Sequence, residues 1–268
     1  SYLEKKLSEN DLNARRDFDK NNQIKRAYKG YQNTKQKLEE LEEKEDEGRD
    51  YPYYKHNPKI SKTAWIVLLL TVPLAYLTYA IVGLKNEILG SFLFCIIMLV
   101  PLLYFSKWDY SLIFRKPTRR EIKLAVLLFI GYMIYALAIG GVLDMIGQGS
   151  TSTVESMGVD IYMMIGLIFS MMGEELMKFI PLMFLMRAVY KFTENRKLAV
   201  IASSVIIMIY FGLLHYDVGT TLISVLLTQG LGTIFELYGY IKTKNLFVPY
   251  LCHLFTDAFI FIFVLLGF

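Results

Sequence analysis

The most constraining feature of this sequence is the uneven distribution of its charged residues. The first 60 of the 268 residues hold 14 Lys and Arg and 13 Asp and Glu, whereas the remaining 208 hold only 15 and 12. So few charges over such a length are not compatible with a water-soluble domain, and long apolar segments are typical of transmembrane helices. The sequence therefore predicts an all-α, polytopic membrane helical bundle that follows a charged extension.

Seven apolar segments in this region are each long enough to cross about 30 Å of hydrocarbon. They lie near 64–84, 88–106, 122–143, 160–187, 198–216, 219–241 and 246–268. The stretch before the first span and the second, fourth and sixth loops are rich in Lys and Arg, while the odd-numbered loops contain only Lys85. By the positive-inside rule, this alternation predicts a cytoplasmic N-terminus and a C-terminus on the opposite side.

The division of charge predicts two domains, a mostly helical cytoplasmic extension at 1–60 and a transmembrane domain at 61–268. Apolar residues of the extension recur at spacings near three, four and seven, which indicates a broken amphipathic helix that Gly48 ends. The three tyrosines at 51–54 then indicate a linker. The extension is either a solvated helix or a docking helix for a cytoplasmic partner or lipid headgroups. Its polar start predicts no signal peptide, and the net charge of +4 argues against nucleic acid as a partner.

Several ionisable residues lie inside the predicted spans, where each costs about 2.5–3.5 kcal/mol on insertion scales. Residues that expensive require a structural or functional reason. Three are in the fourth span, one ends the fifth, one is in the sixth and two are in the seventh: Glu174, Glu175, Lys178, His215, Glu236, His253 and Asp257.

Helical spacing limits how these residues meet. Glu174 and Glu175 are about 100° apart on a helix and cannot face one point, whereas Lys178 is within reach of either carboxylate. His253 and Asp257 are four residues apart and share a face. A buried ion pair and a helix–helix hydrogen bond would account for these pairs without any catalysis. Glu236 is close to a cytoplasmic span end, so we expect a structural residue that reaches the surface.

Together these side chains also provide the types of functional group that a hydrolase site uses. A carboxylate can take a proton from water, a second acid or an imidazole can protonate a leaving amine, and an imidazole N–H can hold an oxyanion. Two histidines and one carboxylate could instead bind Zn²⁺. The sequence lacks the H-E-x-x-H, intramembrane Gly-x-Ser-x and Gly-x-Gly-Asp motifs of other intramembrane proteases.

The motifs resemble those of the CAAX-protease and bacteriocin-processing (CPBP, or Abi) family of membrane proteases. The family pattern is Glu-Glu-x-x-x-Arg, then Phe-x-x-x-His, then His-x-x-x-Asn/Asp on successive spans. Glu174-Glu175, Phe211 to His215, and His253 to Asp257 match it in order, and the resemblance covers about 120–268. One departure is that Phe179 takes the place of the Arg. The preceding Lys178 gives Glu-Glu-x-x-Lys, the form found in PrsW-type proteases.

The resemblance implies a role for each of these residues. Glu174 would activate water with the help of His215, and His253 with Asp257 would stabilise the tetrahedral oxyanion. Glu175 and Lys178 would shape and neutralise the site, with Phe211 as a supporting residue. The family has been described both as glutamate proteases and as metalloproteases. The residues favour the metal-free chemistry, and the alternative is zinc held by His215, His253 and Glu174.

The resemblance further implies an intramembrane endopeptidase, in a bacterial cell membrane, that acts on a membrane-associated peptide or protein. One alternative is a non-catalytic protein on the same scaffold, which confers bacteriocin self-immunity or regulates a membrane partner. Another is an ion or proton transporter that uses the buried carboxylates.

The depths of the three motifs do not agree with one another in straight spans. At 1.5 Å per residue, Glu174 is about 20 Å and His215 about 26 Å from the cytoplasmic span ends, but His253 is only about 10 Å away. The residues can meet only if helices tilt, if a helix kinks at Pro181 or Pro249, or if the last helix begins within the membrane.

Overall fold

The computed structural model describes residues 2–45, 49–149 and 159–266. All regular structure within these residues is helical, which confirms the predicted all-α class. The chain divides into two compact units, Ser1–Asp50 and Tyr51–Phe268.

The first unit is one helix, α1 (Tyr2–Glu45). It is continuous over 44 residues, so the expected break in the amphipathic pattern is absent from it. Its described apolar side chains, such as those of Phe18, Ile24 and Tyr28, are exposed, so they form no core within this unit. The expected stop at Gly48 lies outside the described residues, and a docking partner for α1 stays a prediction.

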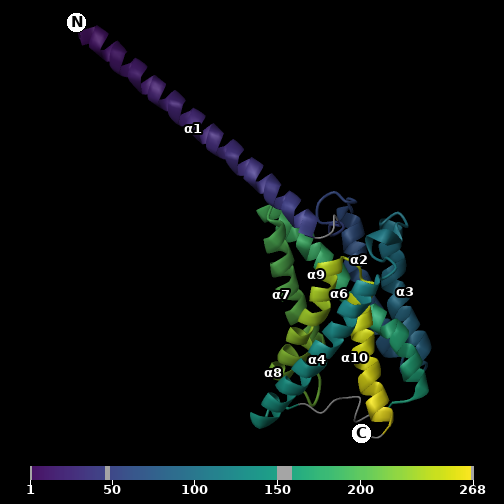
Figure 1. Ribbon diagram of the computed structural model, residues 1–268. Helices are drawn as coiled ribbons and strands as arrows, with labels where there is room; N and C mark the ends of the chain where they lie inside the picture. Colours follow the sequence, from purple (N-terminus) through teal and green to yellow (C-terminus); the bar gives the residue numbers. More distant parts are fainter. Residues whose placement is uncertain (1, 46–48, 150–158, 267–268) are drawn as a thin grey trace. The chain divides into compact units, whose positions relative to one another are not determined.

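The second unit is a bundle whose helices match the seven predicted segments (Figure 1). Its elements are α2 (Lys62–Val82), α3 (Glu87–Phe105), η1 (Tyr110–Leu112), α4 (Arg119–Met145), α6 (Ile161–Thr193), α7 (Arg196–Leu214), α8 (Leu222–Val225), η2 (Leu226–Gly230), α9 (Ile234–Thr243) and α10 (Phe247–Leu265). Six stretches of the described chain are long and apolar enough to cross a membrane, with Leu222–Thr243 taken as one. The remaining predicted span is α6, which differs because it carries charged residues in its middle.

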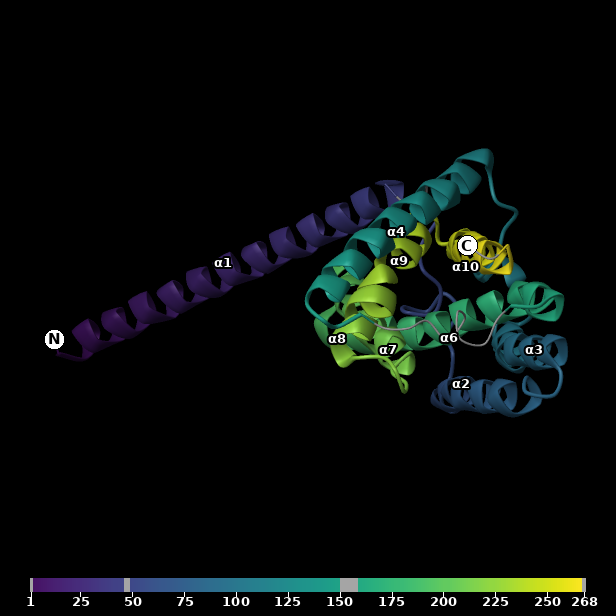
Figure 2. The same ribbon diagram turned by 90° about the horizontal axis from the view of Figure 1, so that it is seen from below.

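Helix α6 is the centre of the bundle. It packs against α2, α3, α7 and α10, and Figure 2 shows it crossing between α2 and α3 on one side and α4 and α10 on the other. Small residues permit the close approach to α3, because a Cβ atom added at Gly173 would lie 2.3 Å from the Phe94 ring. The central position explains why charged side chains on α6 are enclosed by protein instead of lipid.

The sixth predicted span consists of three pieces: α8, the π-helical turn η2, and α9. Helix α7 approaches η2 closely, since a Cβ atom on Gly212 would lie 2.9 Å from the Cα atom of Gly230. Irregular turns of this kind occur often at functional sites. Here the turn lies beside the end of α7, where His215 is located.

The tyrosine cluster at 51–54 belongs to the bundle and is not the expected linker. Tyr51, Tyr53 and Tyr54 are each at most 2% exposed, and the hydroxyl groups of Tyr53 and Ser106 are hydrogen-bonded at 2.6 Å. Their rings fill space among the helix ends, and Tyr53 contacts both Trp65 and Phe179. The boundary between the units therefore precedes this segment, whereas the sequence placed it after residue 60.

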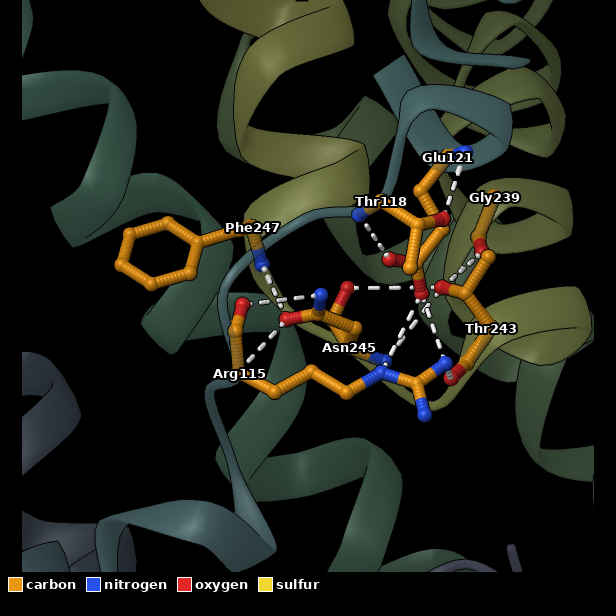
Figure 3. Close-up of polar contacts among 7 residues, drawn as sticks. All are labelled: Arg115, Thr118, Glu121, Gly239, Thr243, Asn245 and Phe247. Carbon is orange, nitrogen blue, oxygen red and sulfur yellow. Dashed lines mark hydrogen bonds and ion pairs between the residues drawn. The ribbon is translucent and has the colours of Figure 1, made fainter. Parts of the chain in front are cut away.

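A buried corner joins α9 to α10, and the loop before α4 covers it (Figure 3). The Asn245 side chain donates to the carbonyl oxygen of Arg115 at 3.1 Å and accepts from the backbone N–H groups of Arg115 and Phe247 at 3.1 and 3.3 Å. The Arg115 guanidinium donates to the Thr243 carbonyl at 3.2 Å and pairs with Glu121 at 2.7 Å. The side-chain amide of Asn245 and the carbonyl of Thr243 thus find their hydrogen-bond partners within the protein.

This corner lies inside the protein. Lys244 and Asn245 are 1% and 0% exposed, and the Tyr51 hydroxyl donates to the Ile241 carbonyl just before them, at 3.3 Å. Because two other segments of the chain cover the turn, α10 begins beneath the protein surface. That the last helix starts within the membrane stays a prediction.

We predict that Asn245→Leu destabilises the bundle by about 2 kcal/mol or more, because it leaves buried backbone groups of Arg115 without partners. Thermal unfolding in detergent micelles would measure the change. Lys116→Ala, an exposed substitution one residue from Arg115, is the matched control and should stay within about 0.5 kcal/mol of wild type. Equal melting temperatures for Asn245→Leu and wild type would show that the corner does not depend on this amide.

Candidate active site

Two adjacent glutamates of α6 occupy different environments. The Glu174 side chain is 22% exposed and faces a cavity, whereas that of Glu175 is 3% exposed and lies against Lys178, with 2.6 Å between Oε1 and Nζ. The angle of about 100° between neighbouring helical residues requires such a separation. Of the two carboxylates, it is Glu175 that forms the predicted ion pair with Lys178.

Lys178 is the centre of a buried charged cluster. Its ammonium group contacts the carboxylates of both Glu175 and Glu236, and it lies 4.4 Å from the centre of the Phe211 ring. A buried charge is tolerated only when opposite charges or aromatic faces surround it. The cluster therefore ties α6 to α9, and Phe211 of α7 closes it from a third side.

His253 of α10 connects this cluster to the cavity. Its Nδ1 atom is hydrogen-bonded to Oε1 of Glu175 at 2.8 Å and lies 3.6 Å from Oε1 of Glu236. Its Nε2 atom is 3.6 Å from Oε2 of Glu174. Since a carboxylate can only accept, Nδ1 is the donor when Glu175 is ionised. The ring is thereby held with Nε2 directed at Glu174.

The cavity on the other side of Glu174 has a volume of about 400 Å³. It lies among α2, α3, α4, α6, α7, η2, α9 and α10, and its polar lining includes Glu174, His215, Gln229, Thr233, Glu236, His253, Thr256 and Asp257. A pocket of this size can hold several residues of an extended chain or a comparable ligand. The first Glu, both histidines and the Asp of the three motifs therefore reach one space.

His215 and Asp257 reach the cavity from two helices. His215 caps the end of α7, and its Nδ1 atom is 2.9 Å from the carbonyl oxygen of Phe211. This contact leaves Nε2 as the ring nitrogen available to the cavity. Asp257 lies one turn beyond His253 on the same helix and lines the same cavity.

The structure corrects the expectation for Glu236. This residue was expected to reach the membrane surface, but it is 8% exposed and belongs to the charged cluster. The physical reason is the buried corner after α9, which places the end of this helix beneath the loop before α4. Gln229 and Thr233 were also missed. The sequence contains a signal for them, because positions 229, 233 and 236 recur at the spacing of one helical face.

A metal ion does not fit the cluster as it stands. Among the described residues, the group of potential ligands that converges is Glu175, Glu236 and His253, with one atom of each within 4.8 Å of the others. This set shares only His253 with the zinc alternative that the sequence suggests. The Lys178 ammonium contacts both carboxylates of the converging group, and a divalent cation there would meet a fixed positive charge at short range.

Comparison with known proteins gives one finding. Residues 156–259 match the model of the family described as type II CAAX prenyl endopeptidase Rce1-like. No curated protein and no solved structure matches the chain significantly. The matched segment contains the whole charged cluster together with Glu174, His215 and Asp257. The predicted resemblance to the CAAX-protease family, a family of membrane proteases, is thereby confirmed for residues 156–259.

Proposed function

We propose that this protein is an intramembrane endopeptidase that hydrolyses a peptide bond of a membrane-associated protein or peptide with water activated by Glu174. The observation that carries the proposal is the pair formed by the partly exposed Glu174 and the buried His253, whose facing atoms are 3.6 Å apart at the wall of a cavity. This separation is too long for a strong direct hydrogen bond, but one water molecule can contact both atoms.

The reaction begins when the Glu174 carboxylate takes a proton from that water as its oxygen attacks the peptide carbonyl carbon. The carbonyl oxygen becomes an oxyanion, and the cavity supplies His253, His215 and Asp257 around it. Protonated imidazoles donate hydrogen bonds to the oxyanion, and Asp257 favours their charged form. Glu174 then transfers its proton to the amine nitrogen as the C–N bond breaks. Water is consumed, and an acid and an amine are released.

Glu175 orients His253 and does not transfer a proton to the substrate. Its Oε1 atom accepts from His253 and pairs with Lys178, so it fixes the ring that faces Glu174. A precise orientation of such groups is a large part of catalytic rate enhancement. The five residues that the motifs suggest as catalytic thus have two kinds of role, with Glu175 as a positioning residue.

The surroundings of the cavity are consistent with a substrate that comes from the bilayer. The helices around the cavity carry exposed apolar side chains, among them Ile134, Ile168 and Phe259, as lipid-facing helices do. We further propose that the bundle is a multi-pass protein of a bacterial cell membrane and that its basic loops lie on the cytoplasmic side.

We predict that Glu174→Gln lowers cleavage by about 10²–10⁴-fold, because the amide cannot accept a proton from water. The measurement is mass spectrometry of new peptide termini in native membranes, with wild-type and variant chains at matched abundance. Glu194→Gln is the matched control, since it makes the same change at the exposed end of the same helix. Termini that persist in Glu174→Gln would contradict the proposed base. A cellular phenotype that persists without any termini would favour the non-catalytic alternative.

The two cavity histidines should differ in their structural effect when they are replaced. We expect His253→Gln and His215→Gln each to lower cleavage by about 10²-fold or more, because each removes a charged donor to the oxyanion. Only His253→Gln should also destabilise the bundle, by about 1–3 kcal/mol, since it disturbs buried Glu175.

The number of new peptide termini measures the effect on cleavage, and thermal unfolding measures the effect on stability. His56→Gln is the control, because His56 is the third histidine of the chain and is exposed. If cleavage were unchanged in His215→Gln, the assignment of His215 to the reaction would be wrong.

A further inference from the structure

The charged cluster contains its own cation. The Lys178 side chain is 4% exposed, and its ammonium nitrogen contacts a carboxylate oxygen of Glu175 and one of Glu236. These are two of the three residues whose ligand atoms converge within 4.8 Å, and the third, His253, is bonded to the same oxygen of Glu175 that Lys178 contacts. Carboxylate oxygens and imidazole nitrogens are also among the ligand types that bind zinc.

The position of the ammonium group differs from that of an ordinary surface ion pair. It is enclosed on three sides, by α6, by α9 and by the ring of Phe211, whose centre is 4.4 Å away. Because the side chains of Glu175 and Glu236 are only 3% and 10% exposed, most of their charge must be balanced within the cluster. Lys178 provides this balance permanently, without any need to capture an ion.

We propose that Lys178 is the built-in cation of this site and replaces a divalent metal among Glu175, Glu236 and His253. The residue is a positioning residue, since it contacts the carboxylates and not the cavity where substrate would lie. It holds Glu175 at the distance at which His253 donates through Nδ1 and directs Nε2 at Glu174. The inference rests on the proposed function only for what the positioned histidine does, because the cation can be tested without any substrate.

The proposal has a consequence that a merely structural lysine would not have. Lys178→Met keeps an unbranched side chain of similar length and removes the positive charge. The negative charge of the Glu175 and Glu236 carboxylates is then no longer balanced. The three converging ligand atoms surround the empty position of the ammonium nitrogen. We therefore expect this single substitution to create a metal site.

The experiment is a titration of wild-type and Lys178→Met chains with Co²⁺ in detergent micelles, followed by calorimetry and by the visible absorption of the bound ion. Lys178→Met should bind one Co²⁺ per chain, and the wild type should show no binding that depends on Glu236 or His253. Two matched variants complete the set. Lys178→Arg keeps the charge and should bind no Co²⁺, and Lys178→Met with His253→Gln should bind at least about tenfold more weakly than Lys178→Met.

Two results would overturn the proposal. One is a wild-type chain that binds Co²⁺ or Zn²⁺ at one ion per chain and loses the ion in Glu236→Gln. The other is a folded Lys178→Met chain that gains no ion. If Lys178→Met does not fold in the absence of metal, recovery of its thermal transition by Zn²⁺ supports the proposal. If Zn²⁺ does not restore folding, the wild-type titration with its Glu236→Gln control decides between the proposal and a bound metal ion. None of these readouts requires proteolysis, so they stay informative if the proposed activity is wrong.

Discussion

The ion pairs of Lys178 with Glu175 and Glu236 are the interactions on which the rest of the site depends. They join α6 to α9, and through the hydrogen bond of Glu175 they extend to His253 on α10. A buried pair of this kind contributes little net stability, because desolvation offsets most of the attraction. It does define how the three helices fit together, since a shifted helix would leave a charge unpaired. Specific geometry is therefore the clearer benefit of the cluster.

The position of this cluster depends in turn on the turn between α9 and α10. The position at which α10 starts in the bundle determines whether His253 lies opposite Glu174. Asn245 and Arg115 close the turn before α10 with protein hydrogen bonds, and Tyr51 covers it from another segment. A turn that is satisfied by protein can lie where water is absent. The depth of the site is thus determined outside the motif residues.

The difference between local sequence patterns and contacts between distant segments explains what could be predicted from the sequence. The motif residues Glu174, His215, His253 and Asp257 stand out because ionisable groups are rare in apolar spans, and the structure brings them to one cavity. The role of Glu236 could not be read in this way, because its depth depends on the α9–α10 corner. The burial of Tyr51 was missed for a similar reason, since Ile241 and Tyr240, which cover it, are more than a hundred residues away in sequence. Local patterns predict helices and their charged positions, whereas non-local contacts determine depth.

The two adjacent glutamates show why the proposed reaction needs both a local motif and a packed surrounding. A general base must meet water, while the residue that orients a histidine must be shielded from it so that its position is fixed. Consecutive positions on one helix satisfy both needs, because the turn of about 100° places one side chain in the cavity and the other in the packed interior. Glu174 is partly exposed and Glu175 is enclosed. Two adjacent residues of one motif thus occupy two different environments. The positive charge of Lys178 balances the enclosed carboxylate of Glu175, so that this carboxylate can be buried.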